Sequence, residues 1–336
     1  MDSKVKISVI MPVYNAEETL IRSVQSAQHQ TLKEIEIICV NDGSKDNSLK
    51  LLEELAKEDS RIRVLSQENS GAGPARNLAL SKARGEFISF LDADDKYASD
   101  NALESLYVAA KRNGVLICGG NSRNIDRATN QLMPINSADK RWYKTEKVYE
   151  VRVRPNCYGY CQFIFDRKML NKGKVRFPSL RRYQDPPFLL KAMIEAGKYC
   201  VIPTIVLTVY REEEHWNEKK LVDCLRGIRQ VMKLSYEHNL LAVQNELVGS
   251  IHPIVDKDSR YFRRVFLYNL NCHNREAKKI MESTGKYVLD CVKKQYKIPD
   301  GNLYEEIIHQ VYGIHWRRYY NLMKQYCVNI YKRMKE

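Results

Sequence analysis

The 336-residue chain has no apolar run long enough to cross a bilayer. Its longest runs, such as residues 7–13, fall far short of the roughly 20 residues that a membrane-spanning helix needs. Tracts rich in Pro, Gly or Ser are also missing, and 44% of the residues are hydrophobic, which excludes a disordered, collagen-like or coiled-coil chain. Residues 1–6 are polar and show no secretory signal. We therefore expect a folded protein of about two domains that remains in the cytosol.

Several site signatures are missing too. The nine cysteines show no zinc-ligand spacing, since Cys157 and Cys161 lack a second pair, so reduced thiols are expected. No glycine follows the first predicted strand, where the dinucleotide-binding fingerprint belongs. No RNA-binding motif is found either. These absences argue against a zinc module and a Rossmann dehydrogenase.

Positive charge is abundant but uneven. The net charge is +14; residues 1–110 carry −5, residues 111–214 carry +10 and residues 215–336 carry +9. A basic surface attracts nucleic acid, anionic lipid headgroups or phosphorylated small molecules, or it is simply a solvated face. Charge alone does not choose among these.

The first 120 residues alternate between strand-like and helix-like patterns. Apolar runs at 6–13, 35–40, 61–66, 87–91 and 115–118 predict buried strands. Between them, four helices are expected. The first starts at Asn15, where Glu18 completes a capping box, and the second contains Leu49, Leu52 and Leu55. The third and fourth cover residues 74–83 and 101–112. Strands separated by such helices predict an α/β fold with a doubly wound, mostly parallel sheet.

After Gly120 the pattern weakens. The pattern predicts an irregular polar insertion over residues 121–150. It predicts strands over 156–167 and 199–209, and a helix over 188–196. From Lys219 onward the chain is strongly helical, so we expect an α/β domain over 1–215 and a helical basic region over 216–336. Residues 304–335 interleave aromatic and basic residues, which is typical of a helix at an anionic membrane surface. A helical bundle with an aromatic core, or an oligomer interface, is the alternative.

Polar residues follow the predicted strands directly, in segments 12–15, 41–44 and 92–95. Ligands of doubly wound sheets bind outside the carboxyl ends of the strands. Asp92 and Asp94 suit a hard cation such as Mg²⁺ or Mn²⁺ beside phosphate oxygens. Taken alone, an Asp-x-Asp sequence is more often a helix cap or a turn, but here it follows an apolar strand of a sheet whose other strand ends also carry polar residues.

Four motifs occur in order: ISVIMPVYN (7–15), VNDGSKD (40–46), GAGPARN (71–77) and FLDADD (90–95). Together they resemble the GT-A fold glycosyltransferases, and within them the inverting family 2 that builds bacterial surface polysaccharides such as capsule and lipopolysaccharide. The resemblance implies metal-dependent transfer of a hexose or N-acetylhexosamine from a UDP-sugar to a hydroxyl of a glycan or lipid-linked oligosaccharide acceptor. It also implies work in the cytoplasm, either free or at the inner face of the membrane.

The resemblance further implies roles for individual residues. Those expected to bind the nucleotide-sugar are Pro12, Val13, Tyr14, Asp42, Arg76, Asp92 and Ala93. Asp94 would ligate Mn²⁺ or Mg²⁺, and His215 would be a second ligand unless it is a surface histidine. Asp95 is read as a helix cap or solvated residue. The family commonly has Asp-Asp where this chain has Asn41 and Asp42.

The segment RRYQDPPF (181–188) carries the expected general base. From the residues alone, Asp185 reads as the cap of a helix that Pro186 begins; the resemblance makes it the catalytic base that takes a proton from the acceptor hydroxyl. Gln184 replaces the family's usual Glu. Arg181 and Arg182 are expected either to hold an acceptor phosphate or to face solvent, and Trp216 either to stack on a sugar or to pack in the core.

Two other functions stay open at this point. A family member that binds a nucleotide-sugar without catalysis is the first, because Asn41 and Gln184 depart from the usual carboxylates. A basic nucleic-acid-binding protein is the second, although the best-organised strand ends lie in the acidic third of the chain. The oligomeric state is not decided by the sequence.

Overall fold

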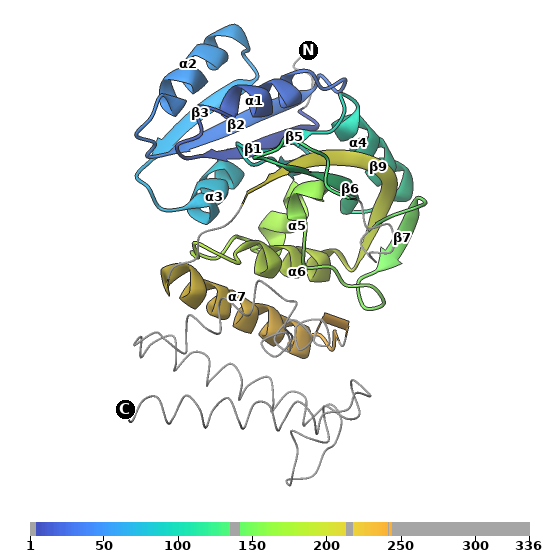
Figure 1. Cartoon of the computed structure of the whole chain (residues 1–336). Helices are drawn as coiled ribbons and strands as arrows, with labels where there is room; N and C mark the ends of the chain where they lie inside the picture. The colour runs from blue at the N-terminus through green and yellow to red at the C-terminus, as the bar shows by residue number, and fades with distance from the viewer. Residues whose placement is uncertain (1–4, 135–141, 213–217, 241, 244–336) are drawn as a thin grey trace, which may run out of the picture. The chain divides into compact units, whose positions relative to one another are not determined.

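The computed structural model describes residues 5–134, 142–212, 218–240 and 242–243. The strands of these residues form one sheet in the order β3-β2-β1-β4-β8-β6-β9-β5, with β7 paired to β9 (Figure 1). The strands are β1 (Ile7–Val13), β2 (Ile35–Asp42), β3 (Ile62–Gln67), β4 (Phe87–Phe90), β5 (Lys96–Tyr97), β6 (Ile117–Asp126), β7 (Lys147–Glu150), β8 (Phe163–Asp166) and β9 (Lys198–Arg211). The α-helices are α1 (Leu20–Gln28), α2 (Ser48–Glu58), α3 (Ala72–Lys82), α4 (Ala102–Asn113), α5 (Arg167–Lys172), α6 (Asp185–Ala196) and α7 (Glu218–Glu237).

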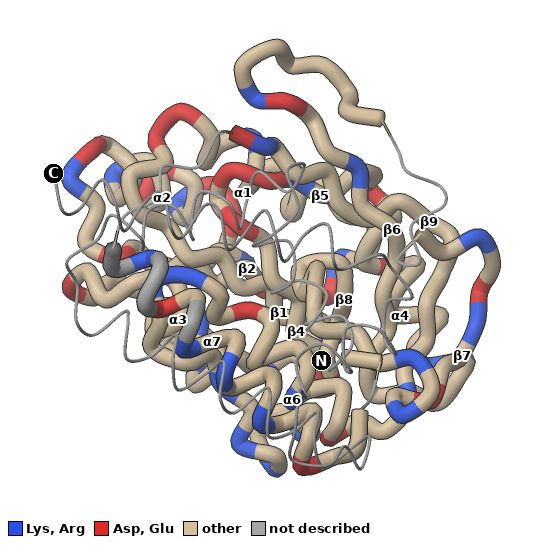
Figure 2. Tube along the Cα trace, turned by 60° about the horizontal axis from the view of Figure 1, so that its bottom comes forward, with Lys and Arg blue, Asp and Glu red and all other residues tan. Residues whose placement is uncertain are grey.

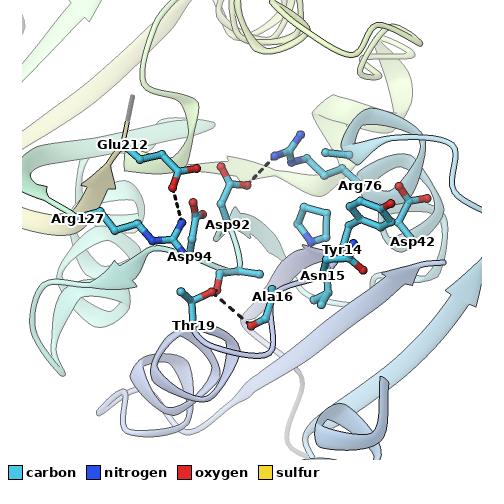
Figure 3. A pocket seen from close by; sticks show the side chains of 14 residues that line it. Tyr14, Asn15, Ala16, Thr19, Asp42, Arg76, Asp92, Asp94, Arg127 and Glu212 are labelled. Atoms are coloured by element: carbon cyan, nitrogen blue, oxygen red, sulfur yellow. Dashed lines mark hydrogen bonds and ion pairs between the residues drawn. The ribbon is translucent and has the colours of Figure 1, made fainter. Parts of the chain in front are cut away.

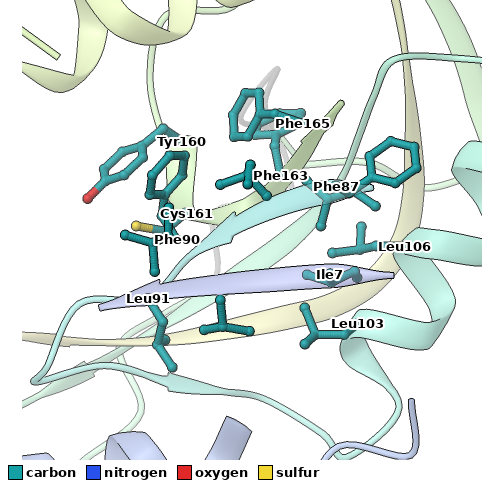
Figure 4. Packing of buried hydrophobic residues seen from close by; sticks show 14 of the residues in the cluster. Ile7, Phe87, Phe90, Leu91, Leu103, Leu106, Tyr160, Cys161, Phe163 and Phe165 are labelled. Atoms are coloured by element: carbon teal, nitrogen blue, oxygen red, sulfur yellow. The ribbon is translucent and has the colours of Figure 1, made fainter. Parts of the chain in front are cut away.

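The predicted α/β sheet is confirmed. Strands β3, β2, β1 and β4 are parallel, and every residue of β1, β2 and β4 is buried because helices cover both faces. Figure 1 shows α1 and α2 on one face and α3 on the other. Figure 4 shows the core beside β4, where the Phe90 ring centroid lies 5.6 Å from that of Tyr160 and 5.8 Å from that of Phe165. Because β3, β2, β1 and β4 run in the same direction, their carboxyl ends meet at one edge of the sheet.

The second half of the sheet is more ordered than the sequence suggested. Residues 121–150, expected to be irregular, contain the end of β6 and all of β7. Strand β6 pairs in parallel with β9 and antiparallel with β8. Gly119 permits the second contact, since a Cβ there would lie 2.2 Å from the Phe163 ring. A run of four polar residues, 121–124, concealed the second half of β6, which is only partly buried after Asn121.

Helix α1 begins at Leu20 rather than at Asn15, so the predicted capping box is wrong. Asn15 has a positive φ of 47° and its Oδ1 accepts a hydrogen bond from the Lys45 amide (2.8 Å). The Ala16 amide donates to Ser48 Oγ (2.8 Å), and Glu17 accepts from Asn47. These contacts fix the segment to the β2–α2 loop, because they satisfy its polar groups outside a helix.

Helix α7 packs against the segment before α6. A Cβ on Gly227 would lie 2.5 Å from the Tyr183 carbonyl oxygen, and the Arg181 amide donates to Asp223 Oδ2 (2.8 Å). Lys and Arg positions recur along α7 (Figure 2). None of the described helices combines the length and the apolar character needed to cross a membrane. The expected boundary at 215 and the segment 304–335 fall outside the described residues, so both stay predictions.

Candidate active site

A pocket of about 320 Å³ opens at the carboxyl ends of β1, β2 and β4 (Figure 3). It is lined by every residue that the sequence assigned to nucleotide-sugar binding and by the predicted metal ligand, namely Pro12, Val13, Tyr14, Asp42, Arg76, Asp92, Ala93 and Asp94. These residues come from four segments that the sheet brings together. His215 and Trp216 lie outside the described residues.

Asp42 holds the loop that follows β3. Its Oδ1 accepts hydrogen bonds from Gln67 Nε2 (2.7 Å) and the Ser70 amide (2.8 Å), and its Oδ2 accepts one from the Gly71 amide (2.8 Å). The carboxylate is therefore already fixed in orientation. Asn41 forms a local turn with its Oδ1 on the Ser44 amide (3.1 Å), a task that an amide performs as well as a carboxylate.

Asp92 and Arg76 form an ion pair at the back of the pocket. Arg76 Nη2 lies 2.6 Å from Asp92 Oδ1, and the Tyr160 hydroxyl donates to the same oxygen (3.0 Å). The Arg76 side chain is only 5% exposed whereas that of Asp92 is 32% exposed. Arg76 Nε and Nη1 are buried with no hydrogen-bond partner among the described residues. The guanidinium therefore keeps two donors for a ligand.

Asp94 lies beside Asp92 with its charge poorly compensated. Burial, and then the charge of Asp92, raise its pKa above the usual value. The backbone here is fixed, since the Ala93 carbonyl accepts hydrogen bonds from Thr19 and Ser23 (both 2.8 Å). Beside Asp94, Arg127 pairs with Glu212 (2.8 Å; Figure 3). The sequence did not identify Arg127 and Glu212 as site residues, although Arg127 directly follows the end of β6 and Glu212 directly follows the end of β9.

Asp95 is neither solvated nor a helix cap, contrary to the expectation. It is buried, its Oδ1 accepts a hydrogen bond from the Tyr210 amide of β9 (2.9 Å), and α4 is capped by Asn101. Burial, followed by the charges of Asp92 and Asp94, raises the pKa of Asp95 to about 8. Asp95 thus joins the loop after β4 to β9.

The carboxylates of this pocket suit a hard divalent cation that shares its coordination with a phosphate. Within the described ranges, no group of three or more His, Cys, Asp or Glu side chains could hold a metal by itself. Mg²⁺ and Mn²⁺ need only one or two carboxylates when phosphates supply the other oxygens. Burial and the charge of Asp92 raise the pKa of Asp94 and the charge of Arg127 offsets them only in part, so a bound cation would favour its ionised form. Asp92 and Asp94 therefore fit the expected metal.

Asp185 is the first residue of α6, and Gln184, not Asp185, is its N-cap. Burial raises the pKa of Asp185, while Arg76 and Arg182 act in the opposite direction. Gln184 packs on α3 so closely that a Cβ on Gly73 would lie 2.5 Å from its Oε1. Tyr183 further fixes the segment. Its backbone has a φ of 61°, and its hydroxyl forms a hydrogen bond with the hydroxyl of Tyr158 (2.9 Å).

A smaller cleft of about 240 Å³ joins Asp185 to the first pocket. Arg76 and Asp92 line both depressions, and Arg182 and Asp185 line the cleft. A ligand in the first pocket can therefore extend toward Asp185. Asp185 is partly buried, and a carboxylate with a raised pKa beside a pocket is a common arrangement for a general base.

Comparisons with known proteins agree with this arrangement. The family model for glycosyl transferase family 2 matches residues 8–173. The uncharacterized glycosyltransferase EpsJ of Bacillus subtilis is 34% identical over 212 residues, which cover 61% of each protein. An uncharacterized glycosyltransferase of Haemophilus influenzae is 32% identical over 190 residues, covering 56% of this chain and 72% of the relative.

The fold is also that of a solved structure. The crystal structure of Staphylococcus aureus TarS, residues 1–349, has a TM-score of 0.66 at 18% identity and covers 86% of this chain and 82% of that one. This chain spans about three fifths of the length of EpsJ. The order of the strand-end motifs, the sheet and these similarities agree, and the chain belongs to glycosyl transferase family 2.

Proposed function

We propose that the chain transfers a hexose or N-acetylhexosamine, with inversion, from a UDP-sugar to a hydroxyl of a glycan acceptor in polysaccharide synthesis. One observation carries the proposal: Arg76 and Asp92 line both the pocket at the strand ends and the cleft that contains Asp185. A donor and a general base can thus face the same reacting carbon. Inverting transfer needs this one base, unlike glycoside hydrolysis, which uses a pair of carboxylates.

A uridine diphosphate is the nucleotide that we favour. TarS was crystallised with UDP and with UDP-GlcNAc. In this chain, Tyr14 is 48% exposed at the pocket and offers an aromatic face to a base. Asp42 Oδ2 accepts one hydrogen bond and retains capacity for another. Together they suit a base with an N–H donor, as uracil has.

Asp92 and Asp94 would hold Mg²⁺ or Mn²⁺ beside the diphosphate. When bound, the cation would neutralise charge on the leaving group. Arg76, which also lines the pocket, would add positive charge near the diphosphate. The four carboxylates and two guanidiniums that line the pocket are a poor site for a diphosphate alone, because the anion would meet net negative charge.

Asp185 would take the proton of the acceptor hydroxyl. Burial raises the pKa of Asp185, which makes its carboxylate a stronger base than an exposed one. Gln184 does not remove this function, because its side chain packs against α3 instead of supplying charge. The comparisons do not favour a nucleic-acid-binding protein or a catalytically silent family member.

Thermal unfolding tests the donor site. UDP, GDP and CDP are compared with and without Mn²⁺ on the wild type, on Asp94→Ala, and on Asp100→Ala as an exposed control outside the clefts. Ligand at about 100 times its dissociation constant stabilises the fold by roughly 2.7 kcal/mol. We expect UDP to stabilise the wild type and the control only with Mn²⁺, and Asp94→Ala to lose the response. A response to GDP alone, or to no nucleotide, contradicts the proposed donor.

A further inference from the structure

Tyr160 lies where the donor pocket meets the cleft that contains Asp185. It lines that cleft together with Asp185, Arg76 and Asp92, and the last two residues also line the donor pocket. Tyr160 is buried, with only 6% of its surface exposed. A buried tyrosine usually has a hydrogen-bond partner for its hydroxyl, and that partner indicates what the side chain does.

The Tyr160 hydroxyl is bound to the carboxylate of Asp92. It donates to Oδ1 (3.0 Å) and lies 3.2 Å from Oδ2, so its single hydrogen is shared unequally between the two oxygens. Oδ1 also accepts a hydrogen bond from Arg76 Nη2 (2.6 Å). In the described part of the chain, the other polar neighbour of Oδ2 is the Cys161 sulfur, at 3.9 Å. Oδ1 is therefore occupied, whereas Oδ2 retains capacity for a ligand.

The aromatic ring of Tyr160 holds its hydroxyl in place. The ring packs against Phe90 (Figure 4), with centroids 5.6 Å apart, and against Phe177, with centroids 5.5 Å apart. Phe177 in turn stacks on Phe188 of α6 at 3.9 Å, and α6 begins at Asp185. A ring enclosed in a close-packed core cannot follow a carboxylate that turns. The hydroxyl is therefore a fixed point, related through the aromatic cluster to the helix of the proposed base.

The same rings support Arg76. Its guanidinium carbon lies 5.1 Å from the centroid of the Tyr160 ring and 5.2 Å from that of Phe177, within the range of cation–π attraction. The ion pair between Arg76 and Asp92 (Figure 3) is thus held from two sides. Such preorganisation lowers the entropic cost of ligand binding. A Tyr160→Phe substitution would keep both rings and remove only the hydroxyl contact with Asp92.

We propose that Tyr160 is a positioning residue, whose hydroxyl turns the Asp92 carboxylate so that Oδ2 serves the cation of the donor site. The inference rests on the proposed function, because it concerns the same metal and diphosphate. Tyr160 would touch neither of them and would act through Asp92. The terminal torsion of an Asp side chain is broad. Without the hydroxyl, the carboxylate would therefore spend less time in the orientation that binds the cation.

A titration of Mn²⁺ into the full chain at a fixed UDP concentration tests the proposal. Calorimetry gives the Mn²⁺ requirement, which is the Mn²⁺ concentration at half-maximal UDP binding. We expect Tyr160→Phe to raise this requirement about tenfold or more, because loss of a hydrogen bond to a metal-binding side chain typically weakens metal binding by about 10- to 100-fold. An unchanged Mn²⁺ requirement in Tyr160→Phe overturns the proposal.

Tyr199→Phe is the matched control. Tyr199 is also a fully buried tyrosine that packs on a phenylalanine, and its hydroxyl donates to the Arg154 carbonyl (2.9 Å). It lines neither the donor pocket nor the cleft of Asp185. Thermal unfolding without ligands measures the stability that each variant loses with its hydroxyl. Tyr199→Phe should keep the wild-type Mn²⁺ requirement whatever its unfolding temperature, and an equal rise in this control would reduce the role of Tyr160 to general stability.

A double-mutant cycle with Asp92→Asn separates positioning from direct contact. If Tyr160 acts only through the carboxylate, then adding Tyr160→Phe to Asp92→Asn should change the Mn²⁺ requirement by less than about twofold. A full additional loss in the double variant would contradict action through Asp92. Failure of the wild type to bind UDP in the presence of Mn²⁺ is a different result, because it overturns the proposed function on which this inference rests.

Discussion

An Asp185→Asn variant should lose activity and gain stability at the same time. The amide keeps the size of the side chain but cannot accept a proton, and loss of a general base typically costs about 10²- to 10⁴-fold in rate. At 1.36 kcal/mol per factor of ten, this is roughly 3–5 kcal/mol of transition-state stabilisation. The donor pocket does not include Asp185, so UDP binding should persist.

The stability gain follows from the sign of the pKa shift. Burial raises the pKa of Asp185 in the folded state, so the folded protein disfavours the charged form relative to the unfolded chain. Its stability is therefore highest below the unfolded pKa of about 3.9 and falls as the pH rises through the folded pKa. Asparagine removes this penalty. The variant should unfold at a higher temperature than the wild type at pH 7, and the difference should vanish below about pH 4.

Sugar transfer, UDP affinity and thermal unfolding are measured on the same preparations, with Asp100→Asn as a control that changes an exposed carboxylate. The control should match the wild type in all three. Wild-type turnover in Asp185→Asn would rule this residue out as the base. A lower unfolding temperature at pH 7 would refute the reasoning from burial, because it would mean that the carboxylate stabilises the fold.

Three other substitutions test separate parts of the structure. Gly73→Ala should lower transfer more than UDP affinity, because its Cβ would lie 2.5 Å from Gln184 Oε1 and displace the segment before Asp185; steady-state kinetics separates the two effects. Tyr14→Ala should weaken UDP by about tenfold, in line with roughly 1–3 kcal/mol for stacking of a base, and leave the unfolding temperature unchanged because Tyr14 is 48% exposed; calorimetric titration measures the affinity. Asp59→Asn should cost about 1–2 kcal/mol at pH 7, because hydrogen bonding to Arg61 lowers the pKa of Asp59 to about 2; this cost should disappear as the pH falls from about 4 toward 2, as followed by urea unfolding.

The parallel half of the sheet could be predicted because its strands are buried on both faces. Residues 7–13 and 35–40 are apolar runs interrupted only by Ser8 and Glu36, and such runs leave little choice of structure. The start of α1 could not be predicted, since it depends on contacts of Asn15 and Ala16 with residues about thirty positions away. Local propensity cannot contain that information.

The donor pocket could be predicted for a related reason. Tyr14, Asp42 and Asp92 each lie at the carboxyl end of a buried strand, so the parallel sheet brings them to one edge regardless of what the loops do. Arg127 and Glu212 obey the same rule. They were missed because the sequence predicted β6 to end at residue 118 instead of Asp126, which placed Arg127 in an irregular insertion.

The placement of side chains at the ends of β6 and β9 depends on the register between the two strands, and this register is not contained in either strand alone. Irregularities between Gly119 and Ser122 add residues to β9, so that Arg123 lies opposite Thr208. The pairing then runs without a shift to Asp126 and Arg211, and the alternation of side chains therefore turns Arg123 and Arg211 to opposite faces of the sheet. Arg211, with Val209, lines the cleft beside Asp185. The side chains that line this cleft are thus set by the pairing of two strands, whereas the residues that would hold the donor follow from strand order.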